Sequence, residues 1–363
     1  MSELTCGFIG LGLIGGSIAK AIKEALPHTR IIVYDINKDS LALALREGVA
    51  DNITDAIDES FSACDYLFLC APVSCNDENL LAVKQVISPD CILTDVGSVK
   101  TAIHQHVKES GLLSQFIGGH PMAGSERFGY VNSKALLLQN AYYILTPSEQ
   151  TDSEKLAAYR DLVQKMGAIP LVLSYEEHDF ITAAISHLPH VIASTLVNLV
   201  RDSDSLEGTM KQIAAGGFKD ITRIASSSPV MWQQICLSNG ENIVCLLQRY
   251  IEALQQTKAA LENKDADTLY ELFDSARVYR DSFVNSSSGP IKRVYDLTLD
   301  IADKPGSLAS IVSLLAEHGI SIKNIGITHN REAAEGSMRL EFYDEEAMLK
   351  TRTILEEQHY DIK

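Results

Sequence analysis

The chain has no stretch rich in lysine or arginine, and its 363 residues carry a formal net charge of −17. Nucleic acids and anionic membranes bind through clustered positive charge, so both are poor partners for it. No apolar run approaches the roughly 20 residues that cross a bilayer. The N-terminus also lacks the basic segment of a signal peptide. We therefore expect a cytoplasmic protein.

The cysteines offer neither a disulfide framework nor a zinc site. There are seven, an odd number, and their spacing does not match that of zinc ligands. Several, such as Cys6 and Cys91, lie inside apolar runs, where a reduced buried thiol is the ordinary case. Reduced thiols agree with a cytoplasmic location, and no metal is expected.

The chain is longer than a single hydrophobic core ordinarily supports. Its pattern of apolar residues changes twice along the sequence, which predicts three domains. Residues 1–175 alternate short strands with helices, which predicts a doubly wound α/β domain of the Rossmann type with a parallel sheet. Residues 176–288 show apolar spacing of three and four, which predicts an all-helical domain. A serine-rich linker, Asn285–Pro290, leads into residues 289–363, whose βαββα order predicts a small ferredoxin-like α+β module. The strands expected in the first region are Leu4–Ile9, Ile31–Tyr34, Tyr66–Cys70, Ile92–Val96, Phe116–Gly118, Tyr142–Leu145 and Leu171–Leu173.

A glycine-rich motif lies between the first strand and the first helix. In it, Gly10 permits a tight turn, Gly12 lets the backbone approach a pyrophosphate, and Gly15 lets the helix pack on the strand. The start of the helix offers unpaired N–H groups to phosphates, and its first residues are Leu13 and Ile14. The motif predicts a dinucleotide site, and the alternative is a glycine-rich turn without a ligand.

The end of the next strand indicates which dinucleotide binds. Asp35 stands where an acidic residue bonds a ribose 2′-OH and repels a 2′-phosphate, which favours NAD over NADP. Ala71 and Pro72 follow the strand that ends at Cys70, and we assign them to the same cofactor site.

Two polar side chains follow strands at the expected carboxyl edge of the sheet, where open α/β folds bind ligands. His120 follows the expected strand that ends at Gly118, and an imidazole there is a candidate general base. The Ser98 hydroxyl would hold its tautomer or touch a substrate oxygen, unless Ser98 is only a helix N-cap. Glu126 would orient a basic group or cap a loop.

The helical region carries further candidates. Ser186 and His190 are four residues apart and share a helix face, and Pro189 between them kinks the helix. Such a polar patch is costly in an apolar helix unless it lines a site, although a satisfied core histidine is the alternative. Gly216 and Gly217 form a glycine pair before an expected basic helix, which contains Arg223. Together they suit an anion, unless this is a surface loop of solvated charges.

These motifs, taken in order, resemble the prephenate/arogenate dehydrogenase family of tyrosine biosynthesis over nearly the whole chain. The resemblance rests on five segments: Gly10–Gly15, Asp95-Val96-Gly97-Ser98-Val99-Lys100, Gly119-His120-Pro121-Met122-Ala123-Gly124, Ser186-His187-Leu188-Pro189-His190 and Gly217-Phe218-Lys219-Asp220-Ile221-Thr222-Arg223.

The resemblance implies a Rossmann domain followed by a helical dimerisation domain, hence a homodimer. The implied reaction is the NAD-dependent oxidative decarboxylation of prephenate to 4-hydroxyphenylpyruvate. His120 would accept the proton of the ring hydroxyl, Ser98 would assist, and Arg223 would hold the ring carboxylate. The remaining substrate contacts would be Ser186, His190, Gly216 and Glu126. Trp232 would be a wall behind the substrate.

The C-terminal module resembles an ACT domain in its strand-to-helix turn, Asp300–Leu308, and in its second strand, which starts at Ile322. ACT domains commonly bind amino acids, so L-tyrosine is the expected effector, with Gly306, Asn324 and Ile325 as its candidate contacts. A purely structural module is the alternative. No mutase-like helical domain precedes the first strand, which favours a monofunctional dehydrogenase.

Three other functions remain open from the sequence. Arogenate dehydrogenase belongs to the same family, and no residue distinguishes the two substrates. A β-hydroxyacid dehydrogenase would need a catalytic lysine on a domain-linking helix, and none is found in that context. A non-catalytic amino-acid sensor would not need the glycine motif or His120.

Overall fold

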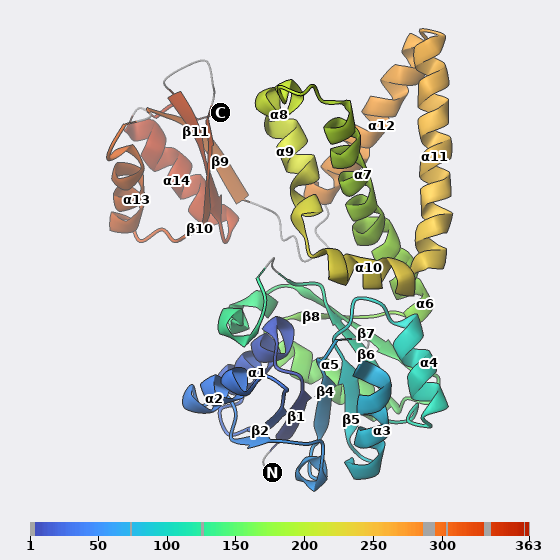
Figure 1. Cartoon of the computed structure of the whole chain (residues 1–363). Helices are drawn as coiled ribbons and strands as arrows, with labels where there is room; N and C mark the ends of the chain where they lie inside the picture. The colour runs from blue at the N-terminus through green and yellow to red at the C-terminus, as the bar shows by residue number, and fades with distance from the viewer. Residues whose placement is uncertain are drawn as a thin grey trace. The chain divides into compact units, whose positions relative to one another are not determined.

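The computed structural model describes residues 4–72, 75–124, 127–285, 295–302, 304–329, 335–358 and 360–362. Its contacts divide the chain into two units, residues 1–259 and 260–363, and each is described by itself (Figure 1). Glu126 and residues 286–290 of the expected linker lie outside the described residues. The domain boundaries near residues 175 and 288 stay a prediction.

A parallel five-stranded sheet forms the centre of the nucleotide-binding region, in the order β3-β2-β1-β4-β5. Its four longer strands agree with the expected ones to within a residue at each end. The three-residue strand β3 was not predicted, because so short a segment carries no alternation. The elements are β1 (Thr5–Ile9), α1 (Leu13–Ala25), β2 (Arg30–Tyr34), α2 (Lys38–Arg46), β3 (Asn52–Thr54), β4 (Tyr66–Leu69), α3 (Asn76–Val86), β5 (Ile92–Asp95) and α4 (Thr101–Glu109).

Helices cover this sheet on both faces (Figure 1). Successive side chains of a strand point to opposite faces, and Phe8 and Ile9 of β1 accordingly enter different cores. Phe8 packs in one cluster with Ile18 of α1, and Ile9 packs in the other with Leu80 of α3. Burial on both faces explains the continuous apolar runs of these strands.

A second, three-stranded sheet holds β6 (Ile117–Pro121), β7 (Tyr142–Pro147) and β8 (Ile169–Val172), and α5 (Ser153–Lys165) joins β7 to β8. A bridge between Leu93 and Phe116 links it to β5. The expectation of a wholly parallel sheet is wrong here, because β7 runs antiparallel to β6. Strand direction depends on the path of the connection, which hydrophobic periodicity does not encode. His120 lies inside β6, opposite Ile144, rather than after its end.

The helical region follows as expected. It holds α6 (Tyr175–Thr182), the π-helical segment η5 (Ala183–His187), α7 (Leu188–Ser203), α8 (Thr209–Ile213), α9 (Gly216–Thr222), the 3₁₀ turn η6 (Arg223–Ser226), α10 (Pro229–Ser238) and α11 (Gly240–Glu262). The π-helical segment ends directly before the turn that contains Pro189. Proline has no N–H to donate, and a π-bulge is one way in which a helix absorbs that loss.

The helix from Tyr175 to Ser203 is longer and more apolar than the sequence pattern suggested. Within its 29 residues an 18-residue window reaches a mean hydropathy of 1.5, so that by length and composition alone it would cross a membrane. Yet its first turns bury His178, Asp179 and Thr182, which form hydrogen bonds inside the protein. These bonds are those of a helix in a folded domain.

The second unit holds α12 (Ala266–Asn285) and a small α/β module. The module contains β9 (Tyr295–Ala302), α13 (Ser307–Glu317), β10 (Ile322–His329), β11 (Glu335–Phe342) and α14 (Glu345–Glu357). Its antiparallel sheet has the order β10-β11-β9, and a bridge joins Leu299 to Ile362 on the free edge of β9. The βαββα order of these elements agrees with the prediction.

Candidate active site

The glycine-rich loop lies between the carboxyl ends of β1 and β4, where the strand order reverses. Gly10 has φ +93°, and a Cβ there would lie 2.6 Å from the backbone nitrogen of Ala71. Only glycine fits both the conformation and the close approach. Such a switch point is where doubly wound sheets bind nucleotides.

The first turn of α1 is open toward this crevice. A Cβ on Gly12 would meet nothing within 4 Å, whereas one on Gly15 would lie 2.9 Å from the Cβ of Cys70. Gly12 therefore leaves room for a ligand, and Gly15 lets the helix pack on the end of β4. The N–H groups of Leu13 and Ile14 have no carbonyl of their own helix to bond, and they suit a pyrophosphate.

Asp35 is fixed beside the same loop. Its Oδ2 accepts a hydrogen bond from the Leu11 N–H at 2.5 Å, and its Oδ1 accepts one from the Asn37 N–H at 2.6 Å. A carboxylate keeps further lone pairs, so it can also accept from a ribose hydroxyl. Ala71 is half-buried and Pro72 exposed at the end of β4. These residues fit NAD, which would supply a hydride acceptor when bound.

Replacing Gly10 tests this site directly. We expect Gly10→Ala to raise the Kd for NAD at least tenfold, because its Cβ would collide with the Ala71 backbone. Titration calorimetry measures the Kd. Gly48→Ala is the matched control, since Gly48 has φ +70° but open space around it. Equal affinities of the two variants for NAD would show that the Gly10 loop does not bind the cofactor.

A buried ion pair holds the backbone of β6 next to β5. The Asp95 carboxylate contacts the Lys100 ammonium, and both side chains are buried. Lys100 Nζ donates to the Gly119 carbonyl at 2.7 Å, and the Gly119 N–H donates to Asp95 at 3.2 Å. A Cβ on Gly119 would lie 2.6 Å from the Asp95 carbonyl oxygen. Glycine before His120 is thus needed for β6 to approach β5 this closely.

His120 contacts the helical region through a second histidine. Its Nδ1 lies 2.8 Å from His178 Nε2, and His178 Nδ1 lies 2.7 Å from Asp179 Oδ1. Asp179 also accepts hydrogen bonds from the Lys100 N–H and from both the N–H and the hydroxyl of Thr101. The first turn of α4 and the start of α6 are therefore joined at one carboxylate.

The surroundings keep His120 neutral. Burial lowers its pKa well below the ordinary value of 6.5, and the nearby His178, Lys100 and His187 lower it further. A neutral imidazole has one nitrogen free to accept a proton, which a general base at neutral pH requires.

Asp179 remains ionised although it is mostly buried. Burial alone would raise its pKa, but the hydrogen bonds from His178, Thr101 and Lys100 outweigh that effect and hold the pKa below its usual value. The site therefore combines a neutral base, His120, with the ionised carboxylate of Asp179, and the His178 ring lies between them.

The second predicted catalytic residue, Ser98, lies in the segment that precedes Lys100. Ser98 is half-buried in the loop from β5 to α4, two residues before Lys100, whose ammonium contacts the residue before His120. Burial lowers the pKa of His187 to about 4, and His178 and His190 lower it further, whereas Asp179 raises it.

The predicted substrate residues are brought together in part. His190 stacks on Trp232 with 3.6 Å between ring centroids. Burial lowers the pKa of His190, a hydrogen bond to the Ile224 backbone raises it, and the charge of Arg223 lowers it. Ser186 is half-buried in the π-helical segment, and Gly216 begins α9 in an exposed position.

Trp232, which the resemblance makes a wall behind the substrate, is half-buried with its ring against His190. Its Nε1 is buried and has no hydrogen-bond partner among the residues that the structure describes. A buried donor of this kind is costly unless a ligand or water accepts from it.

Sequence reasoning missed four residues of this site: His178, Asp179, Lys100 and Asn239. Asn239 Nδ2 donates to the Asp179 carbonyl at 2.8 Å and lies 3.1 Å from His187 Nδ1. The available signal was the His178-Asp179 pair at the start of an otherwise apolar helix. Within the described part of the chain, no group of three or more histidine, cysteine or acidic side chains is arranged for a metal ion.

Comparison with known proteins identifies the family. Residues 18–171 match the family profile described as "Prephenate dehydrogenase, nucleotide-binding domain", and residues 174–275 match "Prephenate dehydrogenase, dimerization domain". A prephenate dehydrogenase of Bacillus subtilis is 38% identical over 353 residues, which are 96% of this chain and 94% of that protein. The chain belongs to the prephenate dehydrogenase family.

Solved structures of the family resemble this one. The prephenate dehydrogenase of Aquifex aeolicus, determined with hydroxyphenyl propionate and NAD+, has 32% identity and a TM-score of 0.73. It covers 78% of this chain and 99% of its own. The arogenate dehydrogenase of Synechocystis has 29% identity and a TM-score of 0.71, covering 77% of this chain and all of its own. The nucleotide-binding and dimerisation regions are thus those of the family, whereas the module from β9 onward lies outside both profiles.

Proposed function

We propose that this protein is an NAD-dependent prephenate dehydrogenase of tyrosine biosynthesis, converting prephenate to 4-hydroxyphenylpyruvate and CO₂. The observation that carries the proposal is the neutral imidazole of His120, held on a strand next to β5 in a region whose glycine-rich loop fits a dinucleotide. The relatives in Bacillus and Aquifex act on the same substrate by their names. The free thiols of all seven cysteines agree with the cytoplasmic location that we propose.

The chemistry requires a base at one ring hydroxyl. As a hydride leaves the carbon that bears this hydroxyl, a carbonyl forms and the oxygen releases its proton. NAD, when bound, accepts the hydride. His120 takes the proton, and Ser98 helps to orient the oxygen. Loss of CO₂ then makes the ring aromatic, so the step is effectively irreversible.

The substrate's two carboxylates need positive or hydrogen-bonding partners, because the net charge of the protein repels anions. Arg223 is our candidate for the ring carboxylate, since a guanidinium binds a carboxylate through two parallel hydrogen bonds. His190, whose ring is held flat on Trp232, and Ser186 would contact the other end. Gly216 and Glu126 complete the proposed contacts.

Steady-state rates with prephenate and with arogenate test the activity. We expect NADH formation, followed by its near-ultraviolet absorbance, with prephenate as the better substrate. A higher kcat/KM with arogenate would assign the chain to the alternative that the Synechocystis relative represents. No turnover of either substrate by folded protein would refute the proposal.

We also propose that the enzyme is a homodimer through its helical region. The long helix leaves Ile185 and Leu199 63% and 62% exposed, and Leu237 and Val244 of the following helices are 79% and 66% exposed. So much exposed apolar surface in a region that matches a dimerisation domain suits a second copy of the chain.

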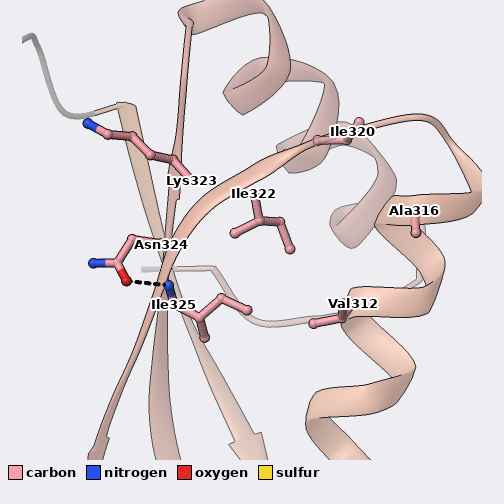
Figure 2. Close-up of a pocket in the computed structure, with 7 residues that line it drawn as sticks. All are labelled: Val312, Ala316, Ile320, Ile322, Lys323, Asn324 and Ile325. Atoms are coloured by element: carbon pink, nitrogen blue, oxygen red, sulfur yellow. Dashed lines mark hydrogen bonds between the residues drawn. The ribbon is translucent and has the colours of Figure 1, made fainter. Parts of the chain in front are cut away.

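For the C-terminal module we propose an ACT domain that binds L-tyrosine. A pocket of about 490 Å³, within the usual range for small ligands, lies between α13 and β10. Figure 2 shows Val312, Ile322 and Ile325 facing one another there, and Lys323 and Asn324 add polar groups to the lining. The pocket includes two of the three candidate contacts, while Gly306, with φ +95°, precedes α13. Apolar walls suit a phenol ring, and polar groups at one side suit an amino acid's charged end.

A single substitution tests the effector site. We expect Asn324→Ala to raise the tyrosine concentration for half-inhibition at least tenfold and to leave the kcat without tyrosine unchanged. Arg352→Ala, on the exposed face of α14, is the control. Unchanged inhibition in Asn324→Ala would place tyrosine elsewhere, with the active site as the first alternative.

A further inference from the structure

The buried pair formed by His178 and Asp179 has no role in the proposed reaction so far. His178 is fully buried, and so is Asp179, at the start of a helix that is otherwise largely apolar. Burying an ionised carboxylate is expensive, and a neutral residue would hold the helix start as well. The pair extends from the Nδ1 side of the proposed base, so that the base, the second imidazole and the carboxylate form one line of hydrogen bonds.

The protons of this line can be placed from the hydrogen bonds. All the groups around the Asp179 carboxylate other than His178 are donors: the N–H of Lys100 and both the N–H and the hydroxyl of Thr101. Asp179 is therefore an acceptor throughout, and His178 Nδ1 must carry the hydrogen in the 2.7 Å bond between them.

This assignment fixes the next two nitrogens. When His178 carries a single ring hydrogen, on Nδ1, its Nε2 is bare and can only accept. His120 Nδ1, 2.8 Å away, must then be the donor in that bond. A neutral His120 with its hydrogen on Nδ1 has a bare Nε2, and this nitrogen can accept a proton from the substrate.

We propose that His178 and Asp179 form a positioning relay that holds His120 in the tautomer whose Nε2 is the base. The inference rests on the proposed dehydrogenase activity. When the ring hydroxyl loses its proton, that proton is bound by His120 Nε2, and the Nδ1 hydrogen stays in its bond to His178. The resulting imidazolium is stabilised by the Asp179 charge acting through His178.

Asp179→Asn tests the relay through its tautomer. In the place of Oδ2 the amide nitrogen would face two donors, the Thr101 N–H and hydroxyl, whereas in the place of Oδ1 it would face one, the Lys100 N–H, and would donate to His178 Nδ1. His178 would then carry its hydrogen on Nε2 and donate to His120, which moves the His120 hydrogen to the substrate side. The same substitution in a Ser-His-Asp triad lowers kcat about 10⁴-fold through the wrong tautomer. We expect a loss of roughly 10³–10⁴-fold in kcat, with the Kd for NAD within threefold of wild type.

A pair of His178 variants covers the case in which Asp179→Asn fails to fold. His178→Gln keeps an acceptor for the His120 N–H, whereas His178→Leu removes it. We expect His178→Leu to lose about 10²-fold in kcat, because the His120 N–H loses its acceptor and the base is no longer held in one tautomer. His178→Gln should recover at least tenfold of that loss. Equal kcat values for the two variants would overturn the relay.

Thr182→Val is the control for packing. Thr182 is buried one turn along the same helix, and its hydroxyl donates to the carbonyls of His178 and Asp179. We expect its kcat to stay within threefold of wild type. A loss as large as that of Asp179→Asn would mean that any disturbance of this helix start lowers activity, and it would overturn the relay.

One readout does not depend on turnover. Nitrogen-15 NMR of histidine-labelled protein distinguishes protonated from bare ring nitrogens, and we expect His120 to show a protonated Nδ1 that is lost in His178→Leu. A bare Nδ1 in the wild type would overturn the relay even if prephenate is oxidised. A protonated Nδ1 in a protein that does not oxidise prephenate would instead contradict only the proposed function.

Discussion

His120→Asn is expected to lower kcat with prephenate by about 10²–10⁴-fold, the usual loss when a general base is removed. The asparagine side chain places its amide group near the positions of the first two imidazole ring atoms after Cγ. An amide does not accept a proton at neutral pH. The Kd for NAD should not change, because the glycine-rich loop after β1 lies in a different segment from β6 and from the His178 that bonds His120. Initial rates of NADH formation measure kcat, and calorimetry measures the Kd for NAD.

The pH dependence adds a second check on the same residue. Because burial and the neighbouring cationic or titratable groups lower the pKa of His120, the base form predominates at neutral pH. In the wild type, kcat/KM should thus stay level as the pH falls through 6.5 and decline only below it, where His120 takes up a proton. A near-normal kcat in His120→Asn would reject the role of His120 as the base.

Lys100→Met is expected to destabilise the first unit by about 3–5 kcal/mol, the range found when one partner of a buried ion pair is removed. The substitution keeps an unbranched chain of similar volume but leaves the buried Asp95 carboxylate without its cation. It also removes the bond from Nζ to the Gly119 carbonyl. The melting temperature should fall by roughly 6–20 °C, which calorimetry or circular dichroism measures.

An exposed ion pair provides the control for Lys100→Met. Lys165 and Asp161 lie 2.6 Å apart on α5, with side chains 48% and 59% exposed. Because such surface pairs contribute about 0–1 kcal/mol, Lys165→Met should hardly change the melting temperature. Similar melting temperatures for the two variants would show that the Lys100–Asp95 pair does not stabilise β6 against β5.

The nucleotide-binding half was predictable because its signals are local. The turn at Gly10 and the helix that begins at Leu13 are dictated by residues a few positions apart, and the structure places them where the sequence indicates. The direction of β7 was not predictable, since it depends on how residues 122–141 connect it to β6. Strand periodicity is the same for both directions.

The environment of His120 was only partly predictable, because its partners are distant in the chain. The sequence singled out His120, but not His178, which is 58 residues away, or the Lys100–Asp95 pair that holds the preceding glycine. Lysine is almost never fully buried unless it is paired, so nothing in the local pattern marked Lys100 as internal. Its role became visible only when β5, α4 and β6 were placed together.

By itself, the sequence determined the order of strands and helices, the dinucleotide loop and the identity of the candidate base. These follow from short-range backbone geometry and from residue types at fixed spacing. Only the tertiary structure showed that His178 and Asp179 lie beside His120 and the start of α4, because these contacts join three separate segments of the chain. A hydrogen bond over such a distance in the chain is set by packing, and packing is a property of the whole fold.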